Sequence, residues 1–330
     1  MDSLTQIALG ACVAAACVPA AHRRKALAVG AMLGTMPDLD VVVDYGDPVA
    51  NFTQHRGFSH SLVVLVPLAV ALWWAMKRWW PPVREAPGRW FAAVMLTLTT
   101  HVLLDAHTAY GTQLWWPLDS PPVAWATLFI IDPTYTLPLL IAAVVTLWRP
   151  RVAAAGWCLA TALALSTAYL GWSWIAQGIV VRNARASLAD RGLADAPIFA
   201  TPTPFNTLLW RVVVLDEEGH LEGFDSVVAD DGPIEFAFRP SDRAALAAAA
   251  AVPAAQRLRW FANEFVSASV DGDLLVLTDL RMGQDPDHVF RHAVARRGNP
   301  HWHEIEPQRL PAEMNLDRLR GVWPRIWSAP

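Results

Sequence analysis

Histidine and aspartate recur in four short segments of the first half of the chain. His101 and Asp105 form the sharpest pair, because residues four apart lie on one face of a helix. An imidazole and a carboxylate placed in this way can bind one metal ion, and such ligands suit zinc as well as manganese or iron. The alternative is a His–Asp hydrogen bond that only fixes helix packing. The other three segments are Pro37–Asp40, His55–Ser61 and Ile131–Pro133.

These three segments add candidate ligands, each with a simpler alternative. His55 and His60 are five residues apart, so one can lie in a loop and the other at a helix start, or both can be exposed loop histidines. Asp38, Asp40 and Asp132 lie beside or near prolines, where an Asp is also a good helix cap or turn residue. The predicted metal ligands are Asp38, Asp40, His55, His60, His101, Asp105 and Asp132.

This ligand set predicts hydrolytic chemistry. A metal held by His and Asp lowers the pKa of a bound water from about 15.7 towards 7, and water activated in this way attacks an ester, phosphoester or amide. The candidates outnumber the ligands of one tetrahedral zinc, so we expect one to three divalent ions. Arg56 is the only permanent cation among these acids, and it can either offset the charge of the site or bind a substrate phosphate or carboxylate bidentately. The predicted catalytic residues are Asp40, Arg56 and Asp132, the two acids serving as ligand or base.

The composition divides the chain into an apolar half and a polar half. Of its 330 residues, 54% are hydrophobic and 17% are charged, and residues 1–180 hold only 10 of the 26 Lys and Arg and 9 of the 30 Asp and Glu. The net charge of −4 gives no sign of a nucleic-acid-binding surface. The three cysteines lie in apolar runs, which argues against disulfides and a cysteine zinc site. We therefore expect a membrane domain over 1–180 and a soluble domain over 181–330.

About six transmembrane segments are predicted in the first domain, since a span needs about 20 mostly apolar residues. The second is the weakest, because Pro37, Asp38 and Asp40 interrupt it. The segments are Leu4–Ala21, Ala26–Val43, Leu62–Trp80, Trp90–Leu104, Leu128–Trp148 and Val152–Trp174.

Charge predicts the orientation of these segments. The basic residues cluster after the first, third and fifth segments, and the positive-inside rule places those loops in the cytoplasm. Nearly all acidic residues and four histidines of this half then fall on the opposite side. We therefore expect a multi-pass protein of a bacterial inner membrane with one outer-face site and an extracytoplasmic C-terminal domain.

The second domain reads as small and α+β. Turn signals such as Glu218-Gly219 and Asp271-Gly272 separate strand candidates, and an Ala-rich helix follows Ser241-Asp242. We expect one small twisted sheet with one or two helices. The strand candidates are Leu209–Leu215, Leu221–Val228, Ile234–Phe238, Phe265–Val270, Leu274–Thr278 and Val289–Val294.

Several motifs resemble one bacterial family. Their order along the chain is typical of bacterial inner-membrane metal-dependent hydrolases of the LexA-regulated type. The motifs are Met1–Gln6, Met36–Asp40, His55–Ser61, the His101/Asp105 helix and Ile130–Pro138. That family is distantly similar to zinc-dependent phospholipase C and related nucleases, whose His-x-x-x-Asp helix motif His101 and Asp105 match. The resemblance implies a zinc-dependent phosphoester hydrolase.

One departure from the family concerns Gln6. Family members commonly carry His at this position, and Gln is a poor zinc ligand. One metal position is therefore lost, weakened or supplied by Asp2.

The leading hypothesis is a membrane-embedded, metal-dependent hydrolase that acts on a phosphoester, including a phospholipid, at the outer face of the membrane. The expected partners are membrane lipids and a lipid or phosphoester substrate. The alternatives are an ion- or proton-coupled transporter, which would need charged groups deeper in the spans, and a non-catalytic scaffold with a structural metal.

Overall fold

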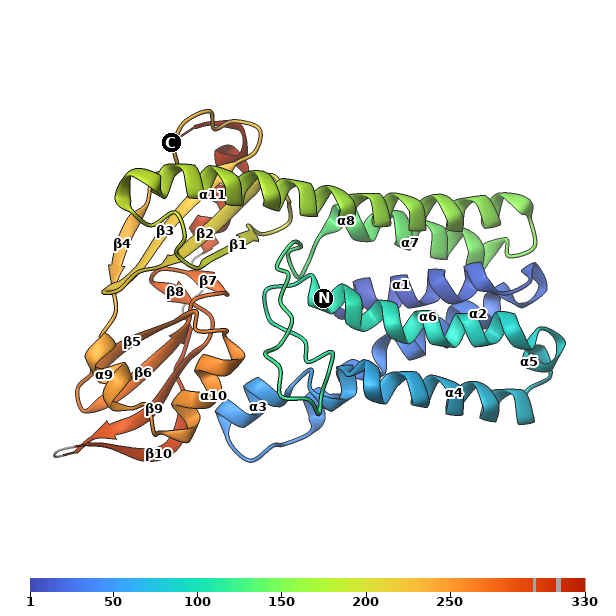
Figure 1. Ribbon diagram of the computed structural model, residues 1–330. Coiled ribbons are helices and arrows are strands. Elements are labelled where there is room, and N and C mark those ends of the chain that lie inside the picture. The colour runs from blue at the N-terminus through green and yellow to red at the C-terminus, as the bar shows by residue number, and fades with distance from the viewer. Residues whose placement is uncertain (299–300, 313–315, 330) are drawn as a thin grey trace.

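Long helices build the first half of the chain. The computed structural model describes residues 1–298, 301–312 and 316–329. In Figure 1 the long helices lie side by side, and α8 continues past them to the sheet-rich C-terminal half. The long helices are α1 (Ser3–Cys17), α2 (Arg23–Thr35), α4 (Leu62–Trp79), α6 (Pro87–Ala106), α7 (Pro133–Trp148) and α8 (Ala153–Leu188). The short elements between them are η1 (Ala20–His22), η2 (Pro37–Val42), α3 (Pro48–Gln54), η3 (Phe58–His60) and α5 (Pro81–Glu85).

Only α4 and the helix that begins at Ala153 are long and apolar enough to cross a membrane, among the described residues. The prediction of about six transmembrane segments is therefore wrong. Helices α1 and α7 are apolar but have 15 and 16 residues, or about 22–24 Å of length, against a hydrocarbon core of about 30 Å. Helix α2 has 13 residues and ends before Pro37. Helix α6 has 20 residues, but its threonines, His101 and Asp105 make it more polar.

Two contacting helices, α1 and α2, hold the centre of this half together. A Cβ on Gly10 would collide with the carbonyl of Gly30, a Cβ on Gly30 would collide with that of Gly10, and one on Gly34 would meet the carbonyl of Gln6. Glycine at these positions lets the two backbones approach closely. This close approach brings the carbonyl of Gly34 to the ring of His101 on α6.

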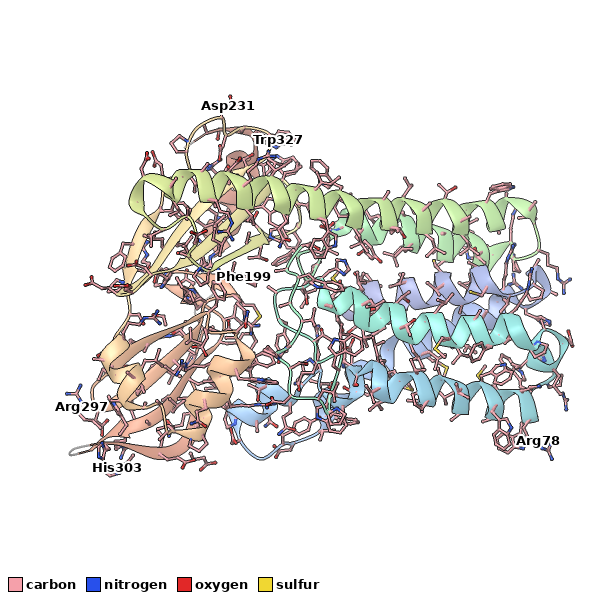
Figure 2. The ribbon with its side chains drawn as sticks, in the orientation of Figure 1. Arg78, Phe199, Asp231, Arg297, His303 and Trp327 are labelled. Carbon is pink, nitrogen blue, oxygen red and sulfur yellow. The ribbon has the colours of Figure 1, made fainter. Side chains whose placement is uncertain are left out.

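The two ends of the helical half differ in charge. Figure 2 shows Arg78 at the end farthest from the C-terminal half. Arg23 and Arg24 donate to the carbonyls of Pro150 and Leu147 at the same end as the α7–α8 turn. The His and Asp segments lie where α2 ends, α4 begins and α6 ends, facing the C-terminal half. Placement of that half outside the cytoplasm depends on six alternating spans, so it stays a prediction.

Among its described residues, the C-terminal half holds two antiparallel four-stranded sheets, so the prediction of a single small sheet is wrong. The first has the order β1 (Ile198–Pro202), β2 (Leu209–Leu215), β3 (Gly219–Ser226), β4 (Ala237–Pro240). The second has the order β10 (Trp302–Arg309), β9 (Arg291–Arg297), β6 (Leu274–Asp279), β5 (Val266–Asp271). A two-stranded ribbon pairs β7 (Gly283–Gln284) with β8 (Asp287–His288). The remaining helices are η4 (Ala189–Arg191), α9 (Arg243–Ala248), α10 (Pro253–Phe261) and α11 (Leu316–Trp327).

Helices cover both sheets and connect them to the first half. The last turns of α8 pack Val180 and Ala184 against Trp210 and Val212 of the first sheet, so the domain boundary predicted at residue 180 lies inside a continuous helix. Helices α9 and α10 cover the second sheet. Phe52 of α3 stacks on Phe290 with 4.3 Å between ring centroids. The helical half is thereby anchored to both sheets.

Candidate metal centre

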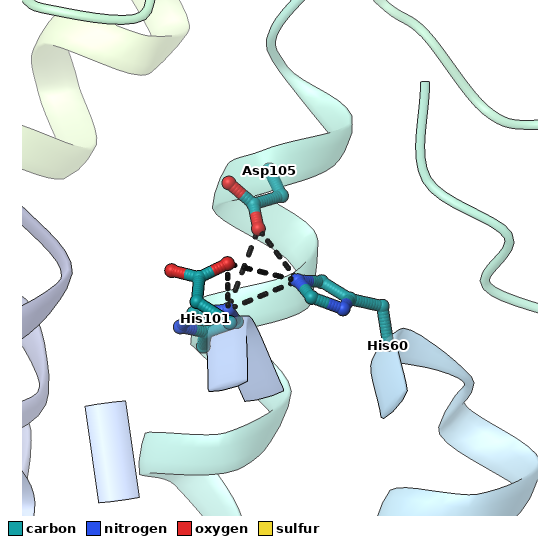
Figure 3. Close-up of side chains that lie close together, drawn as sticks. His60, His101 and Asp105 are labelled. Atoms are coloured by element: carbon teal, nitrogen blue, oxygen red, sulfur yellow. Dashed lines mark hydrogen bonds and ion pairs between the residues drawn. The ribbon is translucent and has the colours of Figure 1, made fainter. Parts of the chain in front are cut away.

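Four side chains converge at the end of the helical half that faces the sheets. Asp38 comes from η2, His60 from the end of η3, and His101 and Asp105 from α6. One donor atom from each lies within 4.8 Å of all the others. Figure 3 shows His60 Nε2 and the Asp105 carboxylate directed at the same point as His101. His60 and Asp105 are fully buried, and His101 is 1% exposed.

The spacing of these donor atoms fits one small divalent ion. His60 Nε2 lies 3.1 Å from Asp105 Oδ2, 3.3 Å from Asp38 Oδ1 and 3.3 Å from His101 Nε2. His101 Nε2 lies 3.4 Å from Asp105 Oδ2 and 3.6 Å from Asp38 Oδ1. A tetrahedron of ligands at 2.0–2.1 Å from zinc has edges of about 3.3–3.4 Å. The group could therefore hold a metal ion with little movement of its side chains.

Hydrogen bonds on the far side of each ring direct both imidazoles at this point. His101 Nδ1 lies 2.8 Å from the carbonyl of Gly34, to which it donates, so Nε2 keeps its lone pair for the centre. His60 Nδ1 lies 2.9 Å from Ser59 Oγ, and that hydroxyl donates to Asp40 Oδ2 at 2.6 Å. Outer hydrogen bonds of this kind are typical of metal-binding histidines, because they fix the tautomer and the ring orientation.

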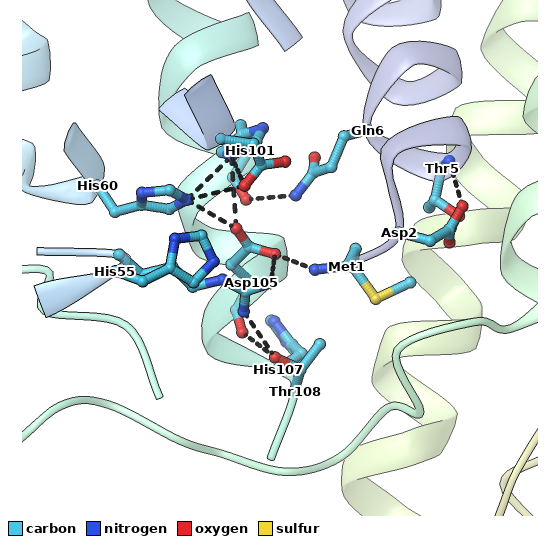
Figure 4. Close-up of polar contacts among 12 residues, drawn as sticks. Met1, Asp2, Thr5, Gln6, His55, His60, His101, Asp105, His107 and Thr108 are labelled. Carbon is cyan, nitrogen blue, oxygen red and sulfur yellow. Dashed lines mark hydrogen bonds and ion pairs between the residues drawn. The ribbon is translucent and has the colours of Figure 1, made fainter. Parts of the chain in front are cut away.

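The two carboxylate oxygens of Asp105 have different partners, the metal-binding group on one side and nearby cations on the other (Figure 4). Its Oδ2 faces the two histidines, whereas its Oδ1 contacts the amino group of Met1 and lies 3.3 Å from Arg56 Nη2. Arg56 also donates from Nη1 to Thr108 Oγ1 at 3.1 Å. Its Nε is buried and has no hydrogen-bond partner among the described residues. A guanidinium donor is thus available beside the centre.

Asp40 is not one of the four grouped donors, but it connects the segments that surround them. Its carboxylate accepts from His55 Nδ1 at 2.8 Å, from the backbone N–H of Arg56 at 2.9 Å, and from Ser59. Burial raises the pKa of Asp40, but the hydrogen bonds from His55 and Ser59 outweigh it and hold the pKa below its usual value. The backbone of Arg56 has φ of 60°, a strained conformation for a residue other than glycine. Asp40 thus fixes both His55 and Arg56.

Asp132 and Gln6 occupy other positions. Asp132 caps the N-terminus of α7, and its second oxygen accepts from the hydroxyl of Tyr169 at 2.9 Å. It therefore does not join the described group. Gln6 is 1% exposed and donates to the carbonyl of His101 at 3.1 Å, while its Oε1 has no hydrogen-bond partner within the described part of the chain. Asp2 caps α1 and does not replace it.

A cavity of about 1020 Å³ borders this site. Asp40, His55, Arg56 and Thr108 form its wall on the side of the metal centre, whereas the four grouped donors are not part of its lining. Side chains from the sheet-rich half form the opposite wall. Sequence reasoning missed Ser59 and Thr108 as supporting groups, since hydroxyl side chains carry no spacing signal of their own.

The comparisons with known proteins place the helical half in a family. A family model described as YdjM inner membrane protein matches residues 1–180. This chain belongs to the YdjM inner membrane protein family. The predicted resemblance to a bacterial inner-membrane family is confirmed at that level, and the likeness to hydrolases and phospholipase C stays a prediction.

Two relatives match part of the chain. The inner membrane protein YbcI of Escherichia coli (strain K12) is 32% identical over 91 residues, which are 27% of this chain and 51% of the relative. The uncharacterized protein YfhP of Bacillus subtilis (strain 168) is 27% identical over 146 residues, or 40% of this chain and 42% of the relative. The chain thus spans about half the length of these relatives or less. No solved structure matches the chain.

Proposed function

We propose that this inner membrane protein is a metal-dependent hydrolase of phosphoesters. The observation that carries the proposal is the convergence of Asp38, His60, His101 and Asp105 at spacings close to the edges of a zinc tetrahedron. Zinc suits two imidazoles and two carboxylates, and manganese or iron are alternatives. A bound divalent ion supplies Lewis acidity and makes water ionisable near neutral pH.

The neighbouring residues supply the other functions that phosphoester hydrolysis needs. Arg56 lines the cavity beside the centre, and its guanidinium suits a phosphate anion. His55 lines the cavity and donates from Nδ1 to Asp40, which leaves its Nε2 as an acceptor or donor of a proton. Asp40 orients this ring through its carboxylate. In contrast, Asp132 is engaged at the start of α7, so its predicted catalytic role has no support in the geometry.

The proposed reaction consumes one water for each ester bond. The water oxygen forms a bond to phosphorus, and the bond from phosphorus to the leaving alcohol oxygen breaks. One water proton passes to an accepting group, for which His55 Nε2 is placed, and a proton ends on the leaving alcohol. Positively charged Arg56 offsets the charge that accumulates on the phosphoryl oxygens during this displacement.

A structural metal is the second candidate function. Four protein donors already complete a tetrahedral zinc shell, and closed shells are typical of structural sites, whereas catalytic zinc keeps an open position. An ion at this site would tie η2 and η3 to α6. The coordination number of the bound metal distinguishes the two candidates, because catalysis requires an additional non-protein ligand.

The experiment for the proposed function is a hydrolysis assay on the full chain in detergent. Purified protein is loaded with zinc or manganese and given bis(4-nitrophenyl) phosphate, and release of nitrophenol is measured. His101→Ala should abolish turnover, while His303→Ala, at an exposed position in β10, should leave it unchanged. Turnover that is absent from metal-loaded wild type, or equal in wild type and His101→Ala, would contradict the proposal.

A further inference from the structure

The cavity beside the metal centre has walls from two distant parts of the chain. Val41 and Phe129 belong to the helical half, whereas Met282, Val289 and Phe290 come from the segment around β7 and β8. Its volume of about 1020 Å³ lies at the upper end of typical ligand pockets, which span roughly 300–1,000 Å³. Most of these lining side chains are apolar, so the cavity suits a ligand with a long apolar part.

Two arginines line this cavity from opposite walls, and each lies near one of the adjacent residues Tyr110 and Gly111. The guanidinium of Arg56 lies 5.1 Å from the ring centroid of Tyr110. Arg281 is bound through Nε and Nη2 to Asp279, which directs its Nη1 towards Gly111. Both arginines line the cavity, and Arg56 also contacts Asp105 of the metal centre. This arrangement suits an anionic group on the ligand.

The rim of the cavity exposes apolar side chains. Val41 and Val42 are 71% and 81% exposed, and both also line the cavity. They directly follow Asp40, so the apolar rim adjoins the polar end of the cavity. Exposed apolar side chains grouped at an opening mark a place where a membrane or an apolar ligand makes contact. The rim thus offers an apolar surface to an aliphatic chain.

We propose that the C-terminal half is the substrate-selecting half of the protein and that this cavity binds the phosphate ester of a long aliphatic alcohol. The aliphatic chain lies between the Val41–Val43 rim and the Met282–Phe290 wall, with the phosphate between Arg56 and Arg281. This inference rests on the proposed function, because it places the phosphate beside Arg56, which contacts Asp105 of the metal centre. It adds that residues outside the matched family region determine the substrate.

The experiment measures binding by the full chain in neutral detergent, without a catalytic readout. The probe is radiolabelled hexadecyl phosphate, and the competitors are hexadecanol, which lacks the phosphate, and inorganic phosphate, which lacks the chain. Val289→Trp fills the cavity from its C-terminal wall. Val228→Trp is the matched control, because Val228 is an exposed valine of the same half that does not line the cavity. Val289→Ile keeps an aliphatic wall.

The expected result is saturable binding to wild type, to Val228→Trp and to Val289→Ile, and at least about tenfold weaker binding to Val289→Trp. Each competitor alone should displace the probe poorly. Absence of saturable binding to wild type would overturn the inference whatever the variants do, and so would equal binding to Val289→Trp. Equal displacement by inorganic phosphate would show that a free anion is the ligand.

Failure of the two proposals can be told apart. Binding of hexadecyl phosphate without any hydrolytic activity would contradict the proposed function and leave the cavity assignment in place. Hydrolysis of bis(4-nitrophenyl) phosphate without probe binding would contradict only the cavity assignment.

Discussion

Replacing Asp40 by Asn should weaken metal binding although Asp40 is not one of the four grouped donors. The carboxylate accepts hydrogen bonds from His55, from the backbone of Arg56 and from Ser59. The amide of Asn has one acceptor oxygen, and its NH₂ group faces a donor in either orientation. At least one of these interactions is therefore lost, and the link from Ser59 to His60 is the one nearest the centre.

The size of the effect follows from these bonds. An unsatisfied buried donor costs about 1–3 kcal/mol. Removing an outer hydrogen-bond partner of a metal ligand typically lowers metal affinity by about 10–100-fold, which equals roughly 1.4–2.8 kcal/mol. We therefore expect the dissociation constant for zinc, measured by competition with a chelator on the full chain, to rise by about 10–100-fold in Asp40→Asn.

Asp44→Asn is the matched control for this change. Asp44 is in the same segment and accepts hydrogen bonds from Gly46 and Asn51, but it makes no contact with the group of four. Its substitution should leave the dissociation constant unchanged. The reasoning is refuted if Asp40→Asn binds zinc as tightly as wild type, or if both variants lose affinity equally.

Three further predictions concern other parts of the molecule. Gln6→His replaces a buried amide near His101 by a metal-binding imidazole. Elemental analysis should then show a higher metal-to-protein ratio, and an unchanged ratio would count against a second metal position. Arg56→Lys cannot bind phosphate bidentately, so KM for bis(4-nitrophenyl) phosphate should rise roughly tenfold at unchanged metal content, and loss of metal would instead indicate a structural role. Burial lowers the pKa of His220, His288 and His292 to about 4, 3 and 4, so the unfolded chain binds more protons below pH 6.5. The free energy of unfolding should therefore decrease by up to about 1.4 kcal/mol per histidine and pH unit below pH 6.5. Thermal melts should show a Tm that falls from pH 7 to pH 5, and a pH-independent Tm would disagree with the burial of these histidines.

The helical half shows where hydropathy is a limited guide. The apolar runs coincide with the long helices of this half, but they could not define the helix ends or show which helices are long enough to span a membrane. Pro133 begins α7 and Asp132 caps it, so residues 128–132 are not helical and the remaining helix is too short to span. Pro37 likewise prevents α2 from continuing beyond Thr35. Local capping and proline geometry, together with the polar residues of α6, therefore determine the number of candidate spans.

The candidate site could be predicted only in part. The i,i+4 spacing of His101 and Asp105 indicated one shared face, and the structure places Asp38 and His60 beside them. Sequence could not separate Asp40 from Asp38, because the turn geometry of η2 determines which carboxylate faces inwards. The position of Arg281 in the cavity wall could not be predicted from the sequence either. It depends on how the segment around β7 and β8 packs against a loop about 170 residues earlier in the chain.

The most direct test of the metal centre is elemental analysis of the purified full chain. Wild type should carry at least one equivalent of a divalent transition metal, while His101→Ala and Asp105→Ala should carry almost none, because each variant removes one of four converging donors. His303→Ala should retain the wild-type content. Equal metal content in wild type and both ligand variants, whether high or near zero, would contradict the assignment of this group as a metal centre.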